Sequence, residues 1–331
     1  MSRVAVLGAG NWGTALSLLL AGKGHDISLW VYDPDQADLI ACTRENPFLP
    51  GHALPDEIEI TTSVPEAVSG AETVVFVVRS EGALDVARLM SDCLPEGIPV
   101  ISATKGLIGD SCTTMSQALE TLLCGRNPIV ALSGPNIAAE IARGVPTATV
   151  VASSDPEVAH AAQSLLMTPF LRVYTNSDVI GVEVAGALKN IIAIAAGICD
   201  GMGLGDNTKA ALLTRGLAEI TRLGVKMGAR QATFMGLAGI GDLIVTCASP
   251  LSRNHRVGIG LGQGRPLREV LAEIGQVAEG VPTTEAAFKL ACETGTPMPI
   301  TEQMREVLFC GKLPQAAVAD LMCREPKDEV W

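Results

Sequence analysis

The chain has 331 residues, of which 48% are hydrophobic and 18% are charged, and its net charge is −12 at pH 7. This length predicts one large or two ordinary domains, and the apolar content is sufficient for a real core, which argues against disorder. The acidic balance argues against nucleic acid and anionic membrane as partners, so the positive charge that holds an anionic ligand must be local.

Cysteine and histidine usage adds a second exclusion. The nine cysteines are odd in number and contain no C-x-x-C pair, which predicts reduced thiols in a cytoplasmic protein and no zinc site. The four histidines are scattered, so no metal cluster is indicated. An uncharged run at residues 4–22 has the composition of a signal peptide or membrane span. Glycines and polar residues interrupt it and no cleavage signal follows, so we expect neither, and no membrane insertion.

The first thirty residues have the pattern of a dinucleotide-binding unit: strand, G-x-G-x-x-G turn, helix and strand. These parts fall at residues 4–7, 8–13, 14–21 and 27–32. Gly8 permits the tight turn, Gly10 lets a pyrophosphate approach the backbone, and Gly13 lets the helix pack on the strand. We expect the pyrophosphate at the N-terminus of the helix, where free N–H groups and the dipole favour an anion.

The end of the second strand indicates which dinucleotide is used. Asp33 lies roughly 20 residues after Gly13, where a carboxylate binds the ribose of NAD. No Arg or Lys accompanies it at residues 30–35, so NADH is favoured over NADPH. The alternative for Asp33 is that it only forms a turn and caps a helix. The preference for NADH would be overturned if Arg44 or Arg79 reached the 2′-phosphate of NADPH.

Further α/β units follow in the first half. Apolar strands are expected at 73–78, 99–103, 129–132 and 147–152, with helices at 81–90, 115–123 and 137–142. Ligands bind beyond the carboxyl ends of the strands in such sheets, and Lys105 and the turn at 134–136 lie at such ends. Taken alone, Lys105 is better interpreted as a surface loop residue than as a ligand contact.

The second half differs in composition and in the spacing of its apolar residues. Long Ala- and Leu-rich stretches with helical spacing predict helices near 182–198, 208–227, 231–236, 268–274, 283–294, 301–308 and 314–321. We therefore expect an α/β Rossmann-type N-terminal domain at 1–178 and an all-α C-terminal domain at 179–331.

The stretch at 183–206 is the most informative part of the helical half. Its apolar pattern predicts a helix buried on all sides, with Lys189 and Asn190 in the middle. A buried lysine is costly unless its charge is used. Lys189 is therefore either a proton donor in a cleft or a lysine that reaches the surface along its aliphatic stem.

Three polar patches interrupt the later helices. One runs from 239–242 to Thr246, and its role is open. A second, at 252–256, is expected in a turn closed by Gly258, where Ser252, Arg253 and Asn254 either hold a phosphate or form an exposed basic turn. The third is a polar loop at 276–280, to which no physical role is assigned.

Seven segments together resemble one known family. They are GAGNWG at 8–13, ATKG at 103–106, SGPN at 133–136, GALKN at 186–190, Gly241-Asp242 followed by Thr246-Cys247, SRN at 252–254 and QVAEG at 276–280. With these motifs in order, the chain resembles the bacterial NAD(P)-dependent glycerol-3-phosphate dehydrogenases over nearly its whole length. The resemblance implies reversible reduction of dihydroxyacetone phosphate to sn-glycerol 3-phosphate by NAD(P)H. It also implies supply of glycerophospholipid synthesis by a cytoplasmic homodimer.

The resemblance implies a role for each matching residue, with Lys189 as the proton-transferring lysine. The implied contacts of the triose phosphate are Lys105, Gly134, Asn136, Lys189, Asn190, Asp242, Thr246, Ser252, Arg253 and Asn254. The implied contacts of the cofactor, with the motif residues included, are Gly8, Gly10, Asn11, Trp12, Gly13, Tyr32, Asp33, Lys105, Ala138, Arg253, Val277 and Glu279.

This chain departs from the family in three places. Asn136 stands where many bacterial members carry Ser or Thr. Arg79 stands where proline is usual, which puts a cation near the cofactor cleft. Val31-Tyr32 lacks the charge that members preferring NADPH tend to carry.

Two alternatives remain. The β-hydroxyacid dehydrogenases share the architecture and also use a helix lysine, but they typically carry Asn four residues after it, where this chain has Ala193. The other is a non-catalytic NAD(P)H-binding sensor, against which the retention of Lys189, Asp242 and Arg253 together argues.

Overall fold

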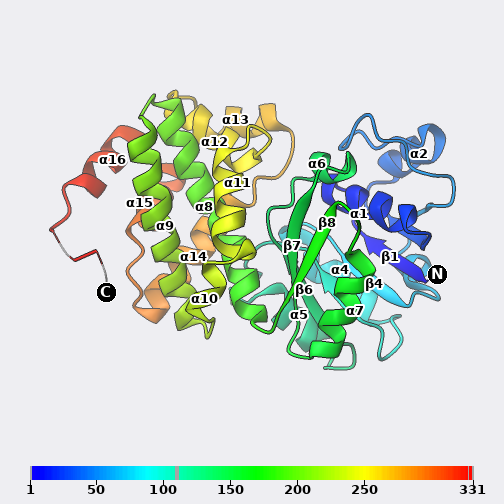
Figure 1. Ribbon diagram of the computed structural model, residues 1–331. Helices are drawn as coiled ribbons and strands as arrows, with labels where there is room; N and C mark the ends of the chain where they lie inside the picture. The colour runs from blue at the N-terminus through cyan, green and yellow to red at the C-terminus, as the bar shows by residue number, and fades with distance from the viewer. Residues whose placement is uncertain (1, 109–111, 327, 330–331) are drawn as a thin grey trace. The chain divides into compact units, whose positions relative to one another are not determined.

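The computed structural model describes residues 2–108, 112–326 and 328–329 (Figure 1). The chain divides into two compact units. The first comprises Met1–Gly186 and Gly228–Asp242, and the second comprises Ala187–Met227 and Leu243–Trp331. The chain therefore leaves the first unit, returns to it for one short segment, and leaves it again.

The first unit contains an eight-stranded sheet in the order β3-β2-β1-β4-β5-β6-β7-β8. All neighbouring strands are parallel except β6 and β7, which are antiparallel. The strands are β1 Arg3–Leu7, β2 Asp26–Trp30, β3 Glu59–Thr61, β4 Thr73–Phe76, β5 Val100–Ser102, β6 Ile129–Ser133, β7 Thr147–Ala152 and β8 Leu171–Asn176. The α/β class predicted from the sequence is confirmed.

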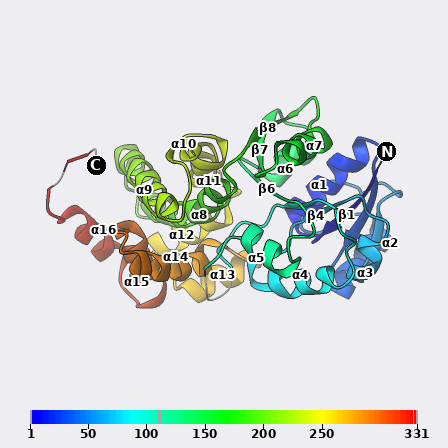
Figure 2. The ribbon, with the colours of Figure 1, turned by 90° about the horizontal axis from the view of Figure 1, so that it is seen from below.

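Helices cover both faces of this sheet, because alternate residues of a strand point to opposite faces. In β1, Val4 and Val6 join the core beneath α1 and α7, whereas Ala5 and Leu7 join the core beneath α3, α4 and α5. Figure 2 shows these two sets of helices on opposite sides of β1 and β4. The helices are α1 Asn11–Gly22, α2 Pro34–Thr43, α3 Val64–Val68, α4 Ala83–Ser91, α5 Met115–Leu122, α6 Ala138–Ala142 and α7 Pro156–Leu166, with a short 3₁₀ turn η1 at Ser80–Gly82.

The described part of the second unit is helical, as expected. Helix α8, Val179–Gly201, begins in the first unit and continues into the second. The return segment contains α10 Gln231–Phe234 and one turn of π-helix, η2 Leu237–Gly241. The other helices are α9 Asp206–Lys226, α11 Asp242–Ala248, α12 Arg253–Gly262, α13 Leu267–Ile274, α14 Gly280–Thr294, α15 Pro299–Phe309 and α16 Pro314–Met322.

The prediction of a turn at 252–256 is wrong, because these residues form the start of α12. Ser252 is the N-cap, and its side chain accepts a hydrogen bond from the backbone N–H of His255 at 3.3 Å. The expected chain reversal at Gly258 does not occur, since Gly258 lies inside the helix. The elements α2, β3, α3, α7, β8 and α11 were not predicted.

Two stretches pass a test for membrane spans by length and composition alone. These are Val179–Gly201, 83% of whose apolar window is buried within the protein, and Gln231–Ala248, for which the figure is 39%. The first value is that of a core helix of a folded unit, as the sequence predicts for α8.

A buried carboxylate, Asp178, holds the return segment in the first unit. Its Oδ1 accepts from the backbone N–H of Gly181 at 3.0 Å, in the first turn of α8. Its Oδ2 accepts from the N–H of Arg230 at 2.8 Å and from Oγ1 of Thr233 at 2.5 Å. Asp178 therefore stabilises the start of α8 and the start of the return segment at once.

Glu183, one turn further along α8, is a second buried carboxylate. Its Oε1 accepts from the N–H of Ser116 at 2.9 Å, and its Oε2 accepts from the hydroxyl of the same residue at the start of α5. Burial raises the pKa of Glu183, and the hydrogen bonds from Ser116 only partly oppose this. The ionised form is therefore less stable here than in the unfolded chain.

Glu183→Gln should reveal this effect as a pH dependence of stability. The amide can accept from the Ser116 N–H and donate to its hydroxyl, so the packing is retained. With its pKa raised in the fold, Glu183 contributes stability that is present below the ordinary glutamate range and is lost as the pH rises through the raised value. Urea unfolding between about pH 4 and pH 8 should show that the unfolding free energy of the variant, relative to that of the wild type, increases as the pH rises.

Glu293→Gln, at an exposed position of α14, is the matched control. A pH dependence no different from that control would contradict the assignment of a buried, destabilised carboxylate to Glu183.

Candidate active site

The glycine turn at 8–13 has the geometry that a dinucleotide requires. Gly8 has φ of 121°, and a Cβ on it would lie 2.5 Å from the carbonyl oxygen of Val77. A Cβ on Gly13 would lie 1.9 Å from the carbonyl oxygen of Gly8, so only glycine allows α1 to start so close to β1. A Cβ on Gly10 would meet no atom within 4 Å, which leaves its backbone open to a ligand.

The N-terminus of α1 fits an anion. Gly10 is the N-cap and has no side chain, so the cap position itself satisfies none of the first N–H groups of the helix. Asn11 lies in this first turn, where its Oδ1 accepts from the N–H of Trp12 at 2.8 Å. The indole Nε1 of Trp12 is buried without a hydrogen-bond partner among the described residues. These residues therefore fit the pyrophosphate of NAD(P).

The end of β2 offers an aromatic surface and a carboxylate. Tyr32 is 74% exposed and meets Trp30 edge-on, with ring centroids 6.1 Å apart. Asp33 is the N-cap of α2, and its Oδ1 accepts from the N–H of Asp35 at 3.0 Å. The interpretation of Asp33 as a helix cap is thus confirmed, and the cap occupies one of its two carboxylate oxygens.

Arg44 and Arg79 differ in what surrounds them. The guanidinium of Arg44 donates to the carbonyl oxygens of Leu54, at 3.3 Å, and Ile58, at 2.9 Å, and to that of Pro55. It also pairs with Asp56 at 3.6 Å, so Arg44 stabilises its own loop. Arg79 is exposed in the loop that follows β4.

Within the first unit, a lysine and an aspartate form a buried ion pair. The ammonium of Lys105, after β5, lies 2.7 Å from Oδ2 of Asp242 and donates to the carbonyl oxygen of Gly134 at 3.1 Å. The Asp242 side chain is 1% exposed and the Lys105 side chain 19%. The interpretation of Lys105 as a surface loop residue is therefore wrong.

The turn after β6 is built around this pair. Gly134 has φ of 139°, which favours glycine. Asn136 donates from Nδ2 to the hydroxyl of Thr149 at 3.0 Å, and its buried Oδ1 has no hydrogen-bond partner among the described residues. A Cβ on Gly186 would lie 2.5 Å from Oγ of Ser133, so the glycine of the GALKN motif leaves room for this turn.

Within the second unit, Lys189 is 6% exposed and donates from Nζ to Oγ1 of Thr246 on α11 at 2.7 Å. The interpretation in which Lys189 reaches the surface is wrong. A lysine in this environment is retained in a fold when polar partners compensate its desolvation, and the hydroxyl of Thr246 is such a partner. The ammonium is thus aimed by a residue far away in the sequence.

The neighbouring side chain, Asn190, binds the start of α12. Its Oδ1 accepts from Nδ2 of Asn254 at 2.9 Å, and Oδ1 of Asn254 accepts from the backbone N–H of Gly280 at 2.9 Å. A Cβ on Gly280 would lie 2.7 Å from the carbonyl oxygen of Asn190. This gives the QVAEG motif a physical role, which is to bring a backbone donor against Asn254.

Helices α8 and α12 are in backbone contact. A Cβ on Gly258 would lie 2.0 Å from the carbonyl oxygen of Ile194, and one on Gly262 would lie 2.5 Å from that of Ile198. Both contacts advance by four residues in the same direction, so the two helices run parallel. The N-terminus of α12, with Arg253 in its first turn, therefore lies at the level of Asn190, and its dipole favours an anion there.

Three predicted cofactor contacts are partly or fully buried. Ala138 is 5% exposed and packs against Ala15 and Leu49, so its side chain belongs to the core. Val277 and Glu279 are half-buried before α14, and Glu279 is its N-cap.

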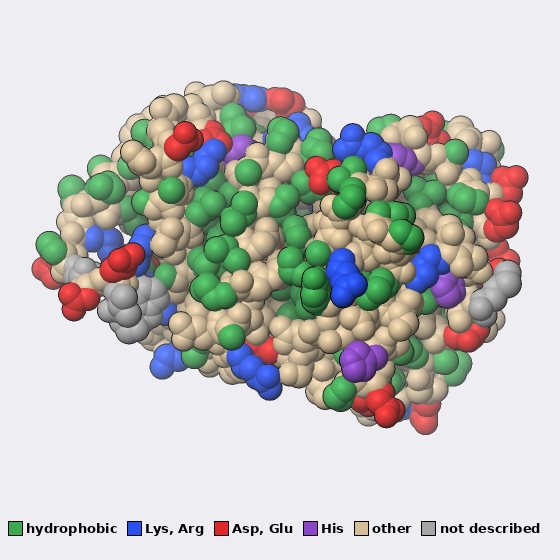
Figure 3. All heavy atoms as spheres, viewed as in Figure 1, with side chains coloured by type: hydrophobic (Ala, Val, Ile, Leu, Met, Phe, Trp, Pro, Cys, Tyr) green, Lys and Arg blue, Asp and Glu red, His purple; other side chains and the backbone are tan. Residues whose placement is uncertain are grey.

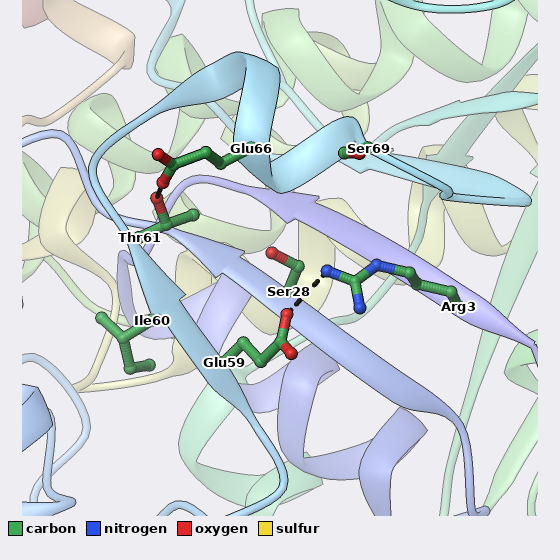
Figure 4. Close-up of a pocket in the computed structure, with 7 residues that line it drawn as sticks. All are labelled: Arg3, Ser28, Glu59, Ile60, Thr61, Glu66 and Ser69. Carbon is green, nitrogen blue, oxygen red and sulfur yellow. Dashed lines mark hydrogen bonds and ion pairs between the residues drawn. The ribbon is translucent and has the colours of Figure 1, made fainter.

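A surface hollow in the first unit lies away from these clusters. Arg3, the first residue of β1, pairs across it with Glu59 at 2.6 Å, and Thr61 donates to Glu66 at 2.7 Å (Figure 4). Its charges are thus paired within the protein, and it is lined by the amino end of β1 instead of the glycine turn.

Several residues that hold the site residues in place were not predicted from the sequence. Asp178 could have been predicted, because an aspartate before a long apolar run is the signature of a helix start. Thr149 and Asp200 have no local signal in the sequence, because their partners Asn136 and His255 are 13 and 55 residues away.

Hydride transfer needs a bound nicotinamide, which a dinucleotide fold positions, and a group that handles the proton of the reacting oxygen. The first unit supplies the dinucleotide fold and the second a buried lysine. The chain therefore has the features of an NAD(P)-dependent oxidoreductase.

Comparison with known proteins identifies the family. Models of the N-terminal and C-terminal parts of NAD-dependent glycerol-3-phosphate dehydrogenase match residues 3–159 and 178–319. Glycerol-3-phosphate dehydrogenase (NAD(P)+) of Geobacter sulfurreducens is 50% identical over 335 residues, covering 99% of each chain. That of Moorella thermoacetica is 52% identical over 328 residues, covering 99% of this chain and 97% of the relative.

Solved structures agree. The crystal structure of glycerol-3-phosphate dehydrogenase from Coxiella burnetii has a TM-score of 0.95 at 38% identity, covering 98% of this chain and 99% of the other. The chain belongs to the NAD-dependent glycerol-3-phosphate dehydrogenase family.

Gly258→Ala tests the backbone contact between α8 and α12. The added methyl group must push the helices apart, which should cost roughly 1–3 kcal/mol of unfolding free energy. Urea unfolding measures the loss. In Gly22→Ala, on α1, the new methyl meets no atom within 4 Å, so stability should be unchanged or higher. Equal stability of the two variants would show that the α8–α12 contact is not close.

Proposed function

We propose that Lys189 is the proton donor in the reversible reduction of dihydroxyacetone phosphate to sn-glycerol 3-phosphate, the reaction of this family. The observation that carries the proposal is the buried ammonium of Lys189 held by Thr246. Negative charge develops on the carbonyl oxygen of the substrate as it is reduced. The ammonium stabilises this charge and gives up a proton to it, and the nicotinamide of bound NAD(P)H supplies the hydride.

The first turn of α12 binds the phosphate in this proposal. Arg253 provides a charge-assisted bond, with Ser252 and Asn254 beside it and the helix N-terminus beneath. Asn190, the neighbour of Lys189, accepts a hydrogen bond from Asn254 and so connects the helix of the lysine to the phosphate-binding turn. Binding energy from the phosphate is thereby used to align the carbonyl.

The remaining assigned substrate contacts belong to the first unit, and the assigned cofactor contacts belong to both units. We assign Lys105, Gly134, Asn136 and Asp242 to the substrate, and the buried Oδ1 of Asn136, which has no partner among the residues that the structure describes, supports a ligand contact there. The residues that would hold NAD(P)H are the glycine turn with Asn11 and Trp12, then Tyr32, Asp33, Lys105, Ala138, Arg253, Val277 and Glu279. In this proposal residues 1–178 form the dinucleotide-binding domain and residues 179–331 form the helical catalytic domain.

The cellular context follows from the family. The product supplies glycerophospholipid synthesis in the cytoplasm, and the nine cysteines, odd in number and without a C-x-x-C pair, support a reducing compartment. We expect no nucleic-acid partner and no membrane insertion. A homodimer is supported by exposed apolar side chains that gather around α9 and α11 (Figure 3). On these helices or just after them, Val225, Ile244 and Leu251 are 46%, 50% and 55% exposed.

Lys189→Ala should abolish turnover while leaving NADH binding nearly unchanged, because the lysine acts on the carbonyl and not on the dinucleotide. Loss of a general acid costs ~10²–10⁴-fold in kcat. Steady-state kinetics and NADH fluorescence titration measure the two effects. Lys226→Ala, an exposed lysine at the end of α9, is the matched control. A loss in kcat of less than about tenfold would remove Lys189 from the chemical step.

NADH should be used at least as well as NADPH. The 2′-phosphate needs a cation beside the end of β2, where Asp33 repels it and Arg44 is bound to loop carbonyls. The measurement is kcat/KM for both cofactors at one ionic strength. A preference of about tenfold for NADPH would mean that exposed Arg79 reaches the phosphate. Arg79→Pro would then remove the preference and Arg44→Ala would not.

A further inference from the structure

Three helices of the second unit meet at one carboxylate, Asp200, in the last turn of α8. Its Oδ2 lies 2.7 Å from Nε2 of His255 on α12, and its Oδ1 lies 2.7 Å from Nζ of Lys209 on α9. The His255 side chain is 7% exposed, whereas Asp200 keeps 28% of its side chain exposed. The contact therefore fixes a buried ring to a partly solvated acid.

In the contact between Asp200 and His255, the acid is the ionised group. Burial acts to raise the pKa of Asp200, but the hydrogen bonds and charges of Lys209 and His255 outweigh it, and the pKa is lowered. The carboxylate is thus ionised at neutral pH and accepts a hydrogen bond from Nε2. Nδ1 of His255 is buried without a hydrogen-bond partner among the described residues. In the described part of the chain, Nε2 therefore makes the hydrogen bond that orients the ring.

His255 lies in the first turn of α12, two residues after Arg253 and directly after Asn254. Its backbone is in contact with α8 as well, since a Cβ on Gly197 would lie 2.0 Å from the carbonyl oxygen of His255. Asn254 fixes one side of this turn to Asn190, and His255 fixes it to Asp200. Consecutive residues of a helix lie about 100° apart around its axis, so the two contacts hold the first turn at two different points of its circumference and oppose its rotation about the α12 axis.

We propose that His255 and Asp200 are positioning residues that set the direction of Arg253 toward the phosphate of the substrate. Neither touches the substrate in this proposal, which rests on the proposed role of Arg253. Removing the contact frees the first turn of α12 to rotate, and Arg253 then meets the phosphate in a poorer geometry. A ketone without a phosphate makes no use of Arg253 and should not sense the change.

The test is kcat/KM for dihydroxyacetone phosphate and for unphosphorylated dihydroxyacetone in two variants. His255→Leu introduces an apolar side chain of similar bulk and removes the N–H donor. His255→Gln keeps an N–H donor close to the position of Nε2. We expect His255→Leu to lose roughly 10- to 100-fold against the phosphate ester and about twofold or less against the ketone. His255→Gln should restore most of the loss, and inhibition by inorganic phosphate should weaken in parallel.

Thr301→Val controls for simple destabilisation. It removes one bond, at 2.8 Å, to the buried Glu219 in the same unit, away from α12. It should lower the unfolding temperature without changing the ratio of the two kcat/KM values. If His255→Leu loses equally against both substrates, or changes the ratio no more than Thr301→Val does, the positioning role is refuted.

Arg253→Ala separates this inference from the proposed function. If Arg253→Ala lowers the preference for the phosphate ester and His255→Leu does not, only the positioning role fails. If Arg253→Ala leaves the preference unchanged, Arg253 is not the phosphate anchor, and both proposals fail together.

Discussion

Backbone contact between α8 and α12 is the constraint on which the substrate half of the molecule depends. Gly197 and Gly201 on α8 face Gly258 and Gly262 on α12, and any side chain at these points would collide with a carbonyl group. Each glycine inside a helix costs roughly 0.5–1 kcal/mol relative to alanine. That cost is offset by the close packing of the two helices. The contact is made by backbone atoms, so no side chain there can change its position. The helix with the lysine and the helix with the arginine are thus held in one register.

The two lysine ammonium groups assigned to the substrate each have a fixed polar partner in their own unit. Lys105 is bound by Asp242 and the ammonium of Lys189 by Thr246. The chain has a net charge of −12, so cations spread over its surface would be screened by salt and would attract an anionic substrate only weakly. Burial beside fixed dipoles and few counter-charges keeps their field local and strong.

The sequence was sufficient for the features that are local. The glycine turn, the buried apolar strands and the lysine inside α8 each follow from neighbouring residues, and the structure bears them out. Helix α12 was missed because its glycines lower helix propensity, and only packing on α8 overrides that. The partners of Lys189 and Asn254 are 57 and 64 residues away, so spacing along the chain cannot reveal them.

The return segment has a consequence for how the chain is made. The last strand of the sheet ends at Asn176, but the first unit also needs Gly228–Asp242, which supply the acid for Lys105. Synthesis of the intervening part takes roughly 3–10 s at ribosomal rates. During that time the nascent sheet is complete while the Lys105 ammonium lacks its carboxylate and the core around Val182 lacks Ala238. The nucleotide-binding half therefore becomes complete only after helices α8 and α9 and the return segment that follows them have been made.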